Sequence, residues 1–318
     1  MISITERVAQ YLAQRQDFGT GLSISAVHIL NTFATFAVNQ GADYVTTELF
    51  WQWKEQYGSA SQQTWCNRLS YVRTFARWLH ALEPQTEVPP PGLIPRRRHR
   101  PPPYIYRTET ITDLITAATQ LHSPRGLRGP TYATLFGLLA VTGMRIGEAL
   151  GLDDQDVDTE AAVLRIRHAK NNGHRMIPIT GCTAQRLVAY RSVRDRLLGS
   201  TGLPAFFLDE QSQRISIHSA QYNFARVSHT IGLREQNSSR HRGHGPRLHD
   251  LRHTFAVHTL LDWNRSGLDP DREMYKLSTW LGHKNPPDTY WYLESVPELL
   301  QWVTRRAEQA LVHRRESS

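Results

Sequence analysis

The chain has 318 residues, of which 40% are hydrophobic and 21% are charged, a globular composition that excludes a disordered or collagen-like protein. Lysine and arginine number 37 against 29 aspartates and glutamates, so the formal net charge is +8, which favours a polyanionic partner such as nucleic acid. Cys66 and Cys182 are too few for a disulfide framework or a four-thiolate zinc site. The first residues lack a secretion signal, and no apolar run approaches the roughly 20 residues of a membrane span. We therefore expect a cytoplasmic, nucleoid-associated protein without membrane contact.

The first 83 residues predict a helical domain. In the last of its helices, apolar side chains recur with a helical period and predict a buried stripe, from Trp65 to Leu79. Arg68, Arg73 and Arg77 fall outside this stripe and face either solvent or a phosphate backbone. Thr46 and Ser61 are placed to cap two of the helices. The predicted helices span residues 3–16, 23–40, 46–57 and 61–82.

Residues 84–103 are rich in proline and arginine and predict an extended interdomain linker. Between residues 84 and 108, five arginines stand against Glu87, which makes this the most basic stretch of the chain. The run is either a solvated segment or a strap across a DNA backbone. The four of these arginines that are candidates for DNA contact are Arg96, Arg97, Arg98 and Arg100.

Residues 104–318 predict a second domain of helices with a small antiparallel sheet. The strands are expected at 162–168 and 174–179, joined by a turn that contains Lys170 and an Asn-Gly pair. The fold class is therefore mainly α with a small antiparallel sheet. The predicted helices span residues 108–121, 130–142, 181–198, 217–231, 247–261, 271–281 and 297–313.

Four short motifs in this domain carry side chains suited to phosphate chemistry. In the first, TGMRIGEAL, two glycines break the chain before a helix that begins at Arg145, where helix-start N–H groups favour an anion. Pairing of Arg145 with Glu148 alone is the simpler interpretation of that motif in isolation. In the second, HDLRHTFA, His249 and Arg252 lie three residues apart on one helix face, where a proton donor and a cation can meet a phosphoryl group.

The third motif is LGH, in which Gly282 ends a helix directly before His283. The fourth is DTYWYL, in which Tyr292 follows His283 by nine residues on a separate short element. Each motif alone is compatible with a purely structural role.

Taken in order, these motifs and the lysine-bearing hairpin resemble the tyrosine recombinases, the phage integrase, Xer and Cre type of DNA breaking and joining enzyme. The match by motif covers residues 104–318, and residues 1–83 match only in architecture, as a helical core-binding (SAM-like) domain. By this resemblance Tyr292 is the nucleophile, Lys170 the hairpin lysine and Glu148 the supporting acidic residue. The remaining catalytic positions fall on Arg145, His249, Arg252 and His283.

The resemblance implies cleavage through a 3′-phosphotyrosyl intermediate and strand exchange through a Holliday junction, with no metal, cofactor or ATP. The implied partner is double-stranded DNA with paired inverted sites, bound by a homotetramer, with accessory DNA-bending proteins compatible with this picture. The amphipathic helix at 297–313 would contact a neighbouring subunit, although packing on its own domain explains its pattern equally well. Two alternatives are a DNA-binding architectural or regulatory protein of the same fold and a type IB topoisomerase-like enzyme.

Two ambiguities remain in the motifs. Segment 237–249 is unusually rich in arginine and histidine, and its histidines suggest either a metal site or, preferably, a basic loop over DNA that includes Arg240 and Arg242. Tyr290 lies two residues before Tyr292, and the nine-residue interval from His283 selects Tyr292. We expect no metal.

Overall fold

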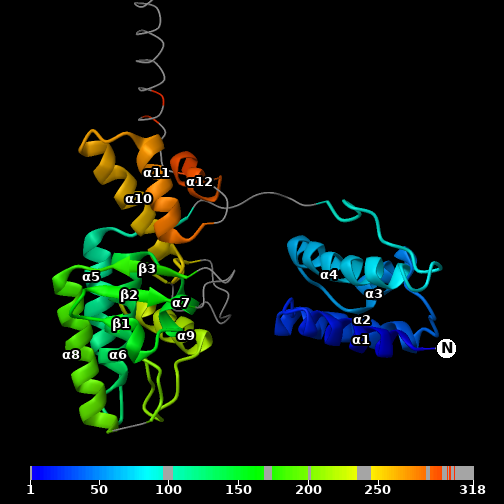
Figure 1. Cartoon of the computed structure of the whole chain (residues 1–318), viewed down its shortest axis with the longest axis horizontal. Helices are drawn as coiled ribbons and strands as arrows, with labels where there is room; N and C mark the ends of the chain where they lie inside the picture. Colours follow the sequence, from blue (N-terminus) through cyan, green and yellow to red (C-terminus); the bar gives the residue numbers. More distant parts are fainter. Residues whose placement is uncertain are drawn as a thin grey trace, which may run out of the picture. The chain divides into compact units, whose positions relative to one another are not determined.

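The computed structural model describes residues 2–95, 103–167, 174–199, 202–234, 245–283 and 287–295, together with Leu299, Gln301 and Thr304. The chain divides into two compact units, residues 1–101 and residues 102–318 (Figure 1). No helix in these ranges is long and apolar enough to cross a membrane.

The first unit consists of helices, as predicted. Thr46 and Ser61 cap two of them, since each side-chain oxygen accepts the backbone N–H of the residue three positions later. Helix α2 packs against each of the other three helices. The helices are α1 (Ile4–Asp17), α2 (Ile24–Asn39), α3 (Thr47–Gln56) and α4 (Gln62–His80).

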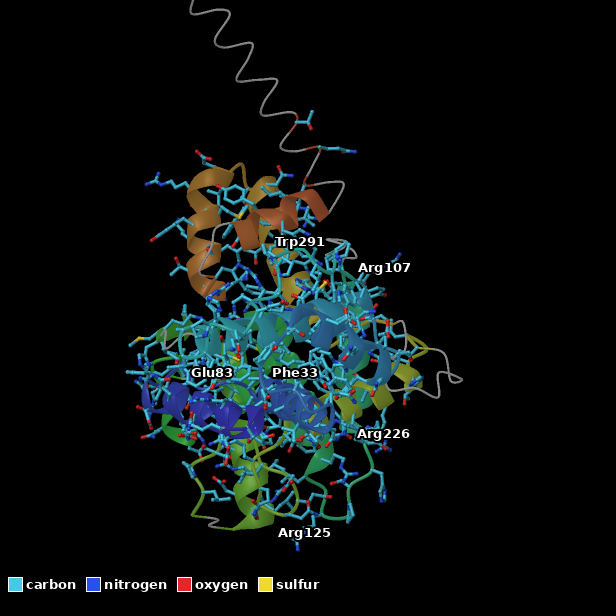
Figure 2. All side chains as sticks on the ribbon, turned by 90° about the vertical axis from the view of Figure 1, so that its right-hand side faces the viewer. Phe33, Glu83, Arg107, Arg125, Arg226 and Trp291 are labelled. Carbon is cyan, nitrogen blue, oxygen red and sulfur yellow. The ribbon has the colours of Figure 1, made fainter. Side chains whose placement is uncertain are left out.

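Aromatic side chains fill the core of this unit. Phe33, labelled in Figure 2, and Phe50 lie edge-to-face with Trp53, and Trp65 closes the cluster from α4. The stripe predicted on α4 is confirmed, because its members from Trp65 to Leu79 are buried.

Residues 84–95 pack with the helical unit, although the sequence places them in the expected linker. The backbone N–H of Glu87 donates to the Val45 carbonyl at 2.7 Å, and the Glu87 carboxylate accepts the Thr47 N–H at 2.8 Å. Ile94 is buried in the core formed by the four helices. Proline prevents regular structure here but not the burial of apolar side chains, so the part that joins the units is shorter than 84–103.

The second unit is arranged around α6, which is buried on almost all sides. Helices α5, α8, α9 and α10 all contact it. Most predicted helices are confirmed within a few residues, but α10 begins at Asp250 rather than at 247. The helices are α5 (Thr108–Thr119), α6 (Arg128–Thr142), α7 (Ile146–Leu150), α8 (Gly181–Leu198), α9 (Ile217–Thr230), α10 (Asp250–Arg265), α11 (Pro270–Leu281) and α12 (Pro287–Ser295).

A three-stranded antiparallel sheet in the order β1-β2-β3 lies beside these helices (Figure 1). The predicted hairpin is confirmed, with β2 (Val163–Ile166) paired to β3 (Arg175–Pro178) so that Ile166 lies opposite Arg175. Strand β1 (Val157–Asp158) was not predicted, because two residues are too short to show an alternating pattern. The hairpin turn at 168–173 lies outside the described residues. Of the helix expected at 297–313, only Leu299, Gln301 and Thr304 are described.

Candidate active site

The turn between α6 and α7 positions Arg145. Gly143 has φ +62°, and a Cβ at this residue would lie 2.4 Å from the Phe255 ring, so only glycine fits. Arg145 then begins α7, where the Glu148 carboxylate accepts both its backbone N–H and its guanidinium at 2.9 Å. The structure therefore contains the Arg145–Glu148 pair.

Three arginines converge on the carbonyl groups at the end of α11. Arg175 Nε donates to the Trp280 carbonyl at 2.9 Å, and Arg252 Nη2 donates to the Leu281 carbonyl at 2.7 Å. Arg145 Nη2 donates to the next carbonyl, that of Gly282, at 3.2 Å. The last carbonyls of a helix lack intrahelical partners and carry partial negative charge, so they attract these cations. Since His283 follows directly, this contact places it beside the arginines.

Arg252 is fixed inside the protein. The residue is 3% exposed, and its Nη1 donates to the Gly143 carbonyl at 2.8 Å. Burial and the positive charge of Arg145 lower the pKa of Arg252 to about 10. The guanidinium therefore remains a cation at neutral pH.

Glu148 is shared between Arg145 and a second arginine, Arg175 on β3. Arg175 Nη1 and Nη2 bind the two oxygens of this carboxylate at 3.1 and 2.7 Å. Burial opposes the charge of Glu148, but the hydrogen bonds from Arg175 and Arg145 prevail and hold its pKa below the ordinary value. Arg175 could not be predicted, because an arginine in a short strand carries no signal beyond its position after the hairpin turn.

Aromatic rings surround the predicted nucleophile. Tyr292, on α12, is 2% exposed, and its hydroxyl lies 3.1 Å from His253 Nδ1. The His283 ring stacks on the Tyr292 ring at 6.3 Å between centroids, while His283 Nδ1 lies 2.7 Å from Thr289 Oγ1. Trp291, labelled in Figure 2, contacts the His253 ring edge-to-face. His253 and Thr289 are therefore two further site residues that the motifs contained but did not single out.

His249 stands immediately before α10, with its ring 4.7 Å from that of His253. Although His249 is exposed, desolvation by the surrounding protein, and then the positive charge of Arg252, lower its pKa to about 4. The imidazole is therefore neutral at pH 7.

Ten further residues were predicted to act on DNA. Arg68, Arg73 and Arg77 belong to the first unit, and the Arg68 guanidinium stacks on the rings of Tyr57 and Trp65 at 4.2 and 4.4 Å. The remaining ones fall outside the described residues, namely Lys170, Arg96, Arg97, Arg98, Arg100, Arg240 and Arg242.

Within the described ranges, no group of three or more histidines, cysteines, aspartates and glutamates is arranged to hold a metal ion. Two histidines of the segment for which a metal was considered, His241 and His244, lie outside those ranges. The charged and titratable groups of the site described above are those of arginine, histidine and tyrosine side chains and one carboxylate.

Sequence comparison identifies relatives along nearly the whole chain. Residues 107–298 match the phage integrase family. A protein of Sinorhizobium fredii named integrase/recombinase y4rB is 38% identical over 97% of this chain and 98% of its own length. The tyrosine recombinase XerC of Bacillus subtilis is 26% identical over 92% of this chain and 91% of its own length.

Solved structures show the same fold at low sequence identity. XerH site-specific recombinase bound to difH DNA gives a TM-score of 0.63 at 15% identity, covering 96% of this chain and 85% of that one. The Tn1549 transposon integrase bound to transposon end DNA gives 0.62 at 15% identity, covering 92% and 94%. The mainly helical fold with a small antiparallel sheet is thus confirmed. From its family match and its relatives, the chain belongs to the phage integrase family of tyrosine recombinases.

Proposed function

We propose that this chain is a site-specific recombinase that cleaves and rejoins DNA through Tyr292. One observation carries the proposal: Arg145 and Arg252 both donate to the turn at 281–282, and the His283 ring next to that turn stacks on the Tyr292 ring. Two guanidinium groups beside a phenol provide positive charge at the place where a DNA phosphate would gain negative charge in the transition state. Arginine fits the oxygens of a phosphate in its fork.

In the proposed step, Tyr292 Oη attacks the phosphorus atom and the bond from phosphorus to the 5′-oxygen breaks. The phenol proton leaves through a neighbouring histidine, and Lys170 supplies a proton to the departing 5′-oxygen. The product is a 3′-phosphotyrosine and a free 5′-hydroxyl. Because the bond to the protein keeps the phosphodiester energy, rejoining to another 5′-hydroxyl needs neither ATP nor a metal.

The histidines have different surroundings and therefore different proposed roles. His253 Nδ1 is within hydrogen-bonding distance of the Tyr292 hydroxyl, so it is the described group best placed to share the phenol proton. His249 and His283 flank the rings of this pair and are proposed to contact the phosphate. Tyr292 is 2% exposed, so attack requires α12 to shift when DNA binds.

DNA with paired inverted sites is the proposed substrate, with residues 1–83 as a core-binding domain and residues 104–318 as the catalytic domain. Between them, the arginines at 96–100 would follow the phosphate backbone. A homotetramer linked by segment 297–313 would bring two sites together, assisted by accessory DNA-bending proteins. The basic net charge of +8 supports the DNA partner. A protein that acts on DNA in this way would be located at the nucleoid.

The test uses nicked duplex fragments that cover the genomic DNA on both sides of the gene. A nick close to the cleavage site releases a short strand and traps the covalent product, which runs slowly in a denaturing gel. We expect such an adduct with the wild-type chain and a Holliday junction when two intact sites are supplied. Absence of an adduct on every fragment would favour an architectural protein, and adducts with supercoil relaxation but no junction would favour a topoisomerase.

A further inference from the structure

We propose that Arg175 is a positioning residue: it neutralises Glu148, so that the Arg145 guanidinium remains available to the scissile phosphate. This inference rests on the proposed function. Glu148 places a carboxylate in the middle of a site that must attract an anion. The Glu148 side chain is 3% exposed and lies 2.9 Å from Arg145 Nη1.

Charge balance explains why a second arginine is needed. Glu148 with Arg145 alone is a neutral pair, which attracts a phosphate weakly. Addition of Arg175 gives this group a net charge of +1, and Arg252 raises the sum for the site to +2. Arg175 takes the larger share of the carboxylate, since it binds both oxygens in a bidentate arrangement.

The exposures of the three side chains agree with this division of roles. The Arg145 side chain is 29% exposed, against 12% for Arg175 and 3% for Glu148. The bonds from Arg145 to the turn at 281–282 are long, at 3.5 and 3.2 Å, whereas Arg175 binds the Trp280 carbonyl at 2.9 Å. Arg145 is therefore the member that can turn toward a ligand, and Arg175 is the member that stays in place.

Arg175 also connects three elements that are far apart in the sequence. It begins β3, the strand that follows the Lys170 turn, and β3 is the strand nearest α11 in Figure 1. Its partners lie on α7 and at the end of α11. A Cβ on Gly282 would approach Arg175 Nη1 to 2.9 Å, so the turn before His283 is shaped around this guanidinium. The Arg175 guanidinium can therefore make all of these contacts only when both Glu148 and the turn at 281–282 have the positions seen here.

The test compares cleavage rates of Arg175→Met on two nicked duplexes, one with the ordinary phosphodiester and one with a neutral methylphosphonate at the scissile position. We expect a loss of at least about tenfold on the ordinary substrate, because loss of a preorganised donor itself costs about 10²–10³ and Arg175 acts through Arg145. On the neutral substrate the loss should be much smaller, since it has no charge for Arg145 to bind. Arg175→Lys, which keeps a cation beside Glu148, should fall between.

Two further variants separate positioning from simple support of the fold. Adding Glu148→Gln to Arg175→Met removes the carboxylate charge that would otherwise neutralise Arg145, and should restore part of the rate on the ordinary substrate. Arg191→Met is the matched control, because Arg191 likewise bridges a carboxylate and backbone carbonyls, those of Asp154 and Val157. That variant should cleave both substrates at wild-type rates.

A wild-type rate for Arg175→Met, or a loss that is equal on both substrates and unrelieved by Glu148→Gln, would overturn the inference alone. Failure of the wild-type chain to form an adduct on any fragment would overturn the proposed function, and with it the inference. The wild-type lane therefore distinguishes the two kinds of failure.

Discussion

Tyr292→Phe should abolish covalent attachment to DNA while leaving the fold almost unchanged. Phenylalanine retains the ring contacts of Tyr292 with His283 and His253, at 6.3 and 5.5 Å between centroids. It lacks the oxygen atom that attacks phosphorus, so no adduct can form by this route. The change removes the hydroxyl group, which lies 3.1 Å from His253 Nδ1.

The expected cost to stability follows from the bond between the hydroxyl and His253. The net contribution of one intramolecular hydrogen bond is about 1 kcal/mol. In a domain of this size, 1 kcal/mol shifts the melting temperature by about 2–4 °C. We therefore expect the Tm of Tyr292→Phe to fall by about 2–4 °C, and DNA binding in a native gel to be nearly unchanged.

Tyr290→Phe is the matched control, because Tyr290 is on the same helix but 40% exposed. It should keep both the adduct and the Tm. Labelled, nicked DNA analysed in a denaturing gel gives the adduct yield, and differential scanning calorimetry gives the Tm. An adduct that persists in Tyr292→Phe, or disappears in Tyr290→Phe, would show that the nucleophile is misassigned.

Three further predictions, which use four substitutions, concern the second unit. A methyl group added at Gly129 would lie 2.4 Å from a backbone oxygen of α5, whereas one at Gly137 would make an ordinary 3.5 Å contact. In urea titrations we expect Gly129→Ala to lower the free energy of unfolding by about 1–3 kcal/mol. Gly137→Ala should raise it by about 0.5–1 kcal/mol. Equal effects of the two substitutions would contradict the close packing of Gly129 against α5. Desolvation holds the pKa of His249 at about 4, below its ordinary 6.5, so the unfolded chain binds more protons between these values. Stability should therefore increase with pH from about 4 to 6.5, and His249→Gln should reduce that slope in urea midpoints. Lys170→Arg should not cleave an ordinary phosphodiester, because arginine is a poor proton donor. Its cleavage rate should recover when sulfur replaces the bridging 5′-oxygen of the substrate. Near wild-type cleavage of the ordinary substrate by this variant would exclude the role of Lys170 as general acid.

The elements that carry the motifs could be predicted, because each element depends on local rules. A glycine pair, a helix start and a three-residue spacing on a helix are visible in sequence, and they predict Arg145 at the start of one helix and Arg252 on another, as the structure has them at α7 and α10. The alternation around an Asn-Gly turn likewise predicts β2 and β3. These elements could be located without knowledge of how they pack.

The connections between those elements could not be predicted. Arg175 is 27 residues from Glu148 in sequence and 105 from Trp280, yet it binds both. Such pairings depend on how β3, α7 and α11 meet, which no periodicity encodes. The packing of residues 84–95 was missed for a related reason, since composition alone indicated a linker.

The nine-residue interval between His283 and Tyr292 has a structural explanation in α12. This helix begins at Pro287, and Thr289 and Tyr292 are three residues apart, so they share one face. Thr289 lies within hydrogen-bonding distance of His283, and Tyr292 stacks on the same histidine, whereas Tyr290 falls on another face and is 40% exposed. A shift of the tyrosine by one or two positions would rotate it away from His283 by about 100° per residue. Helical geometry therefore explains why the spacing selects Tyr292 rather than its neighbour.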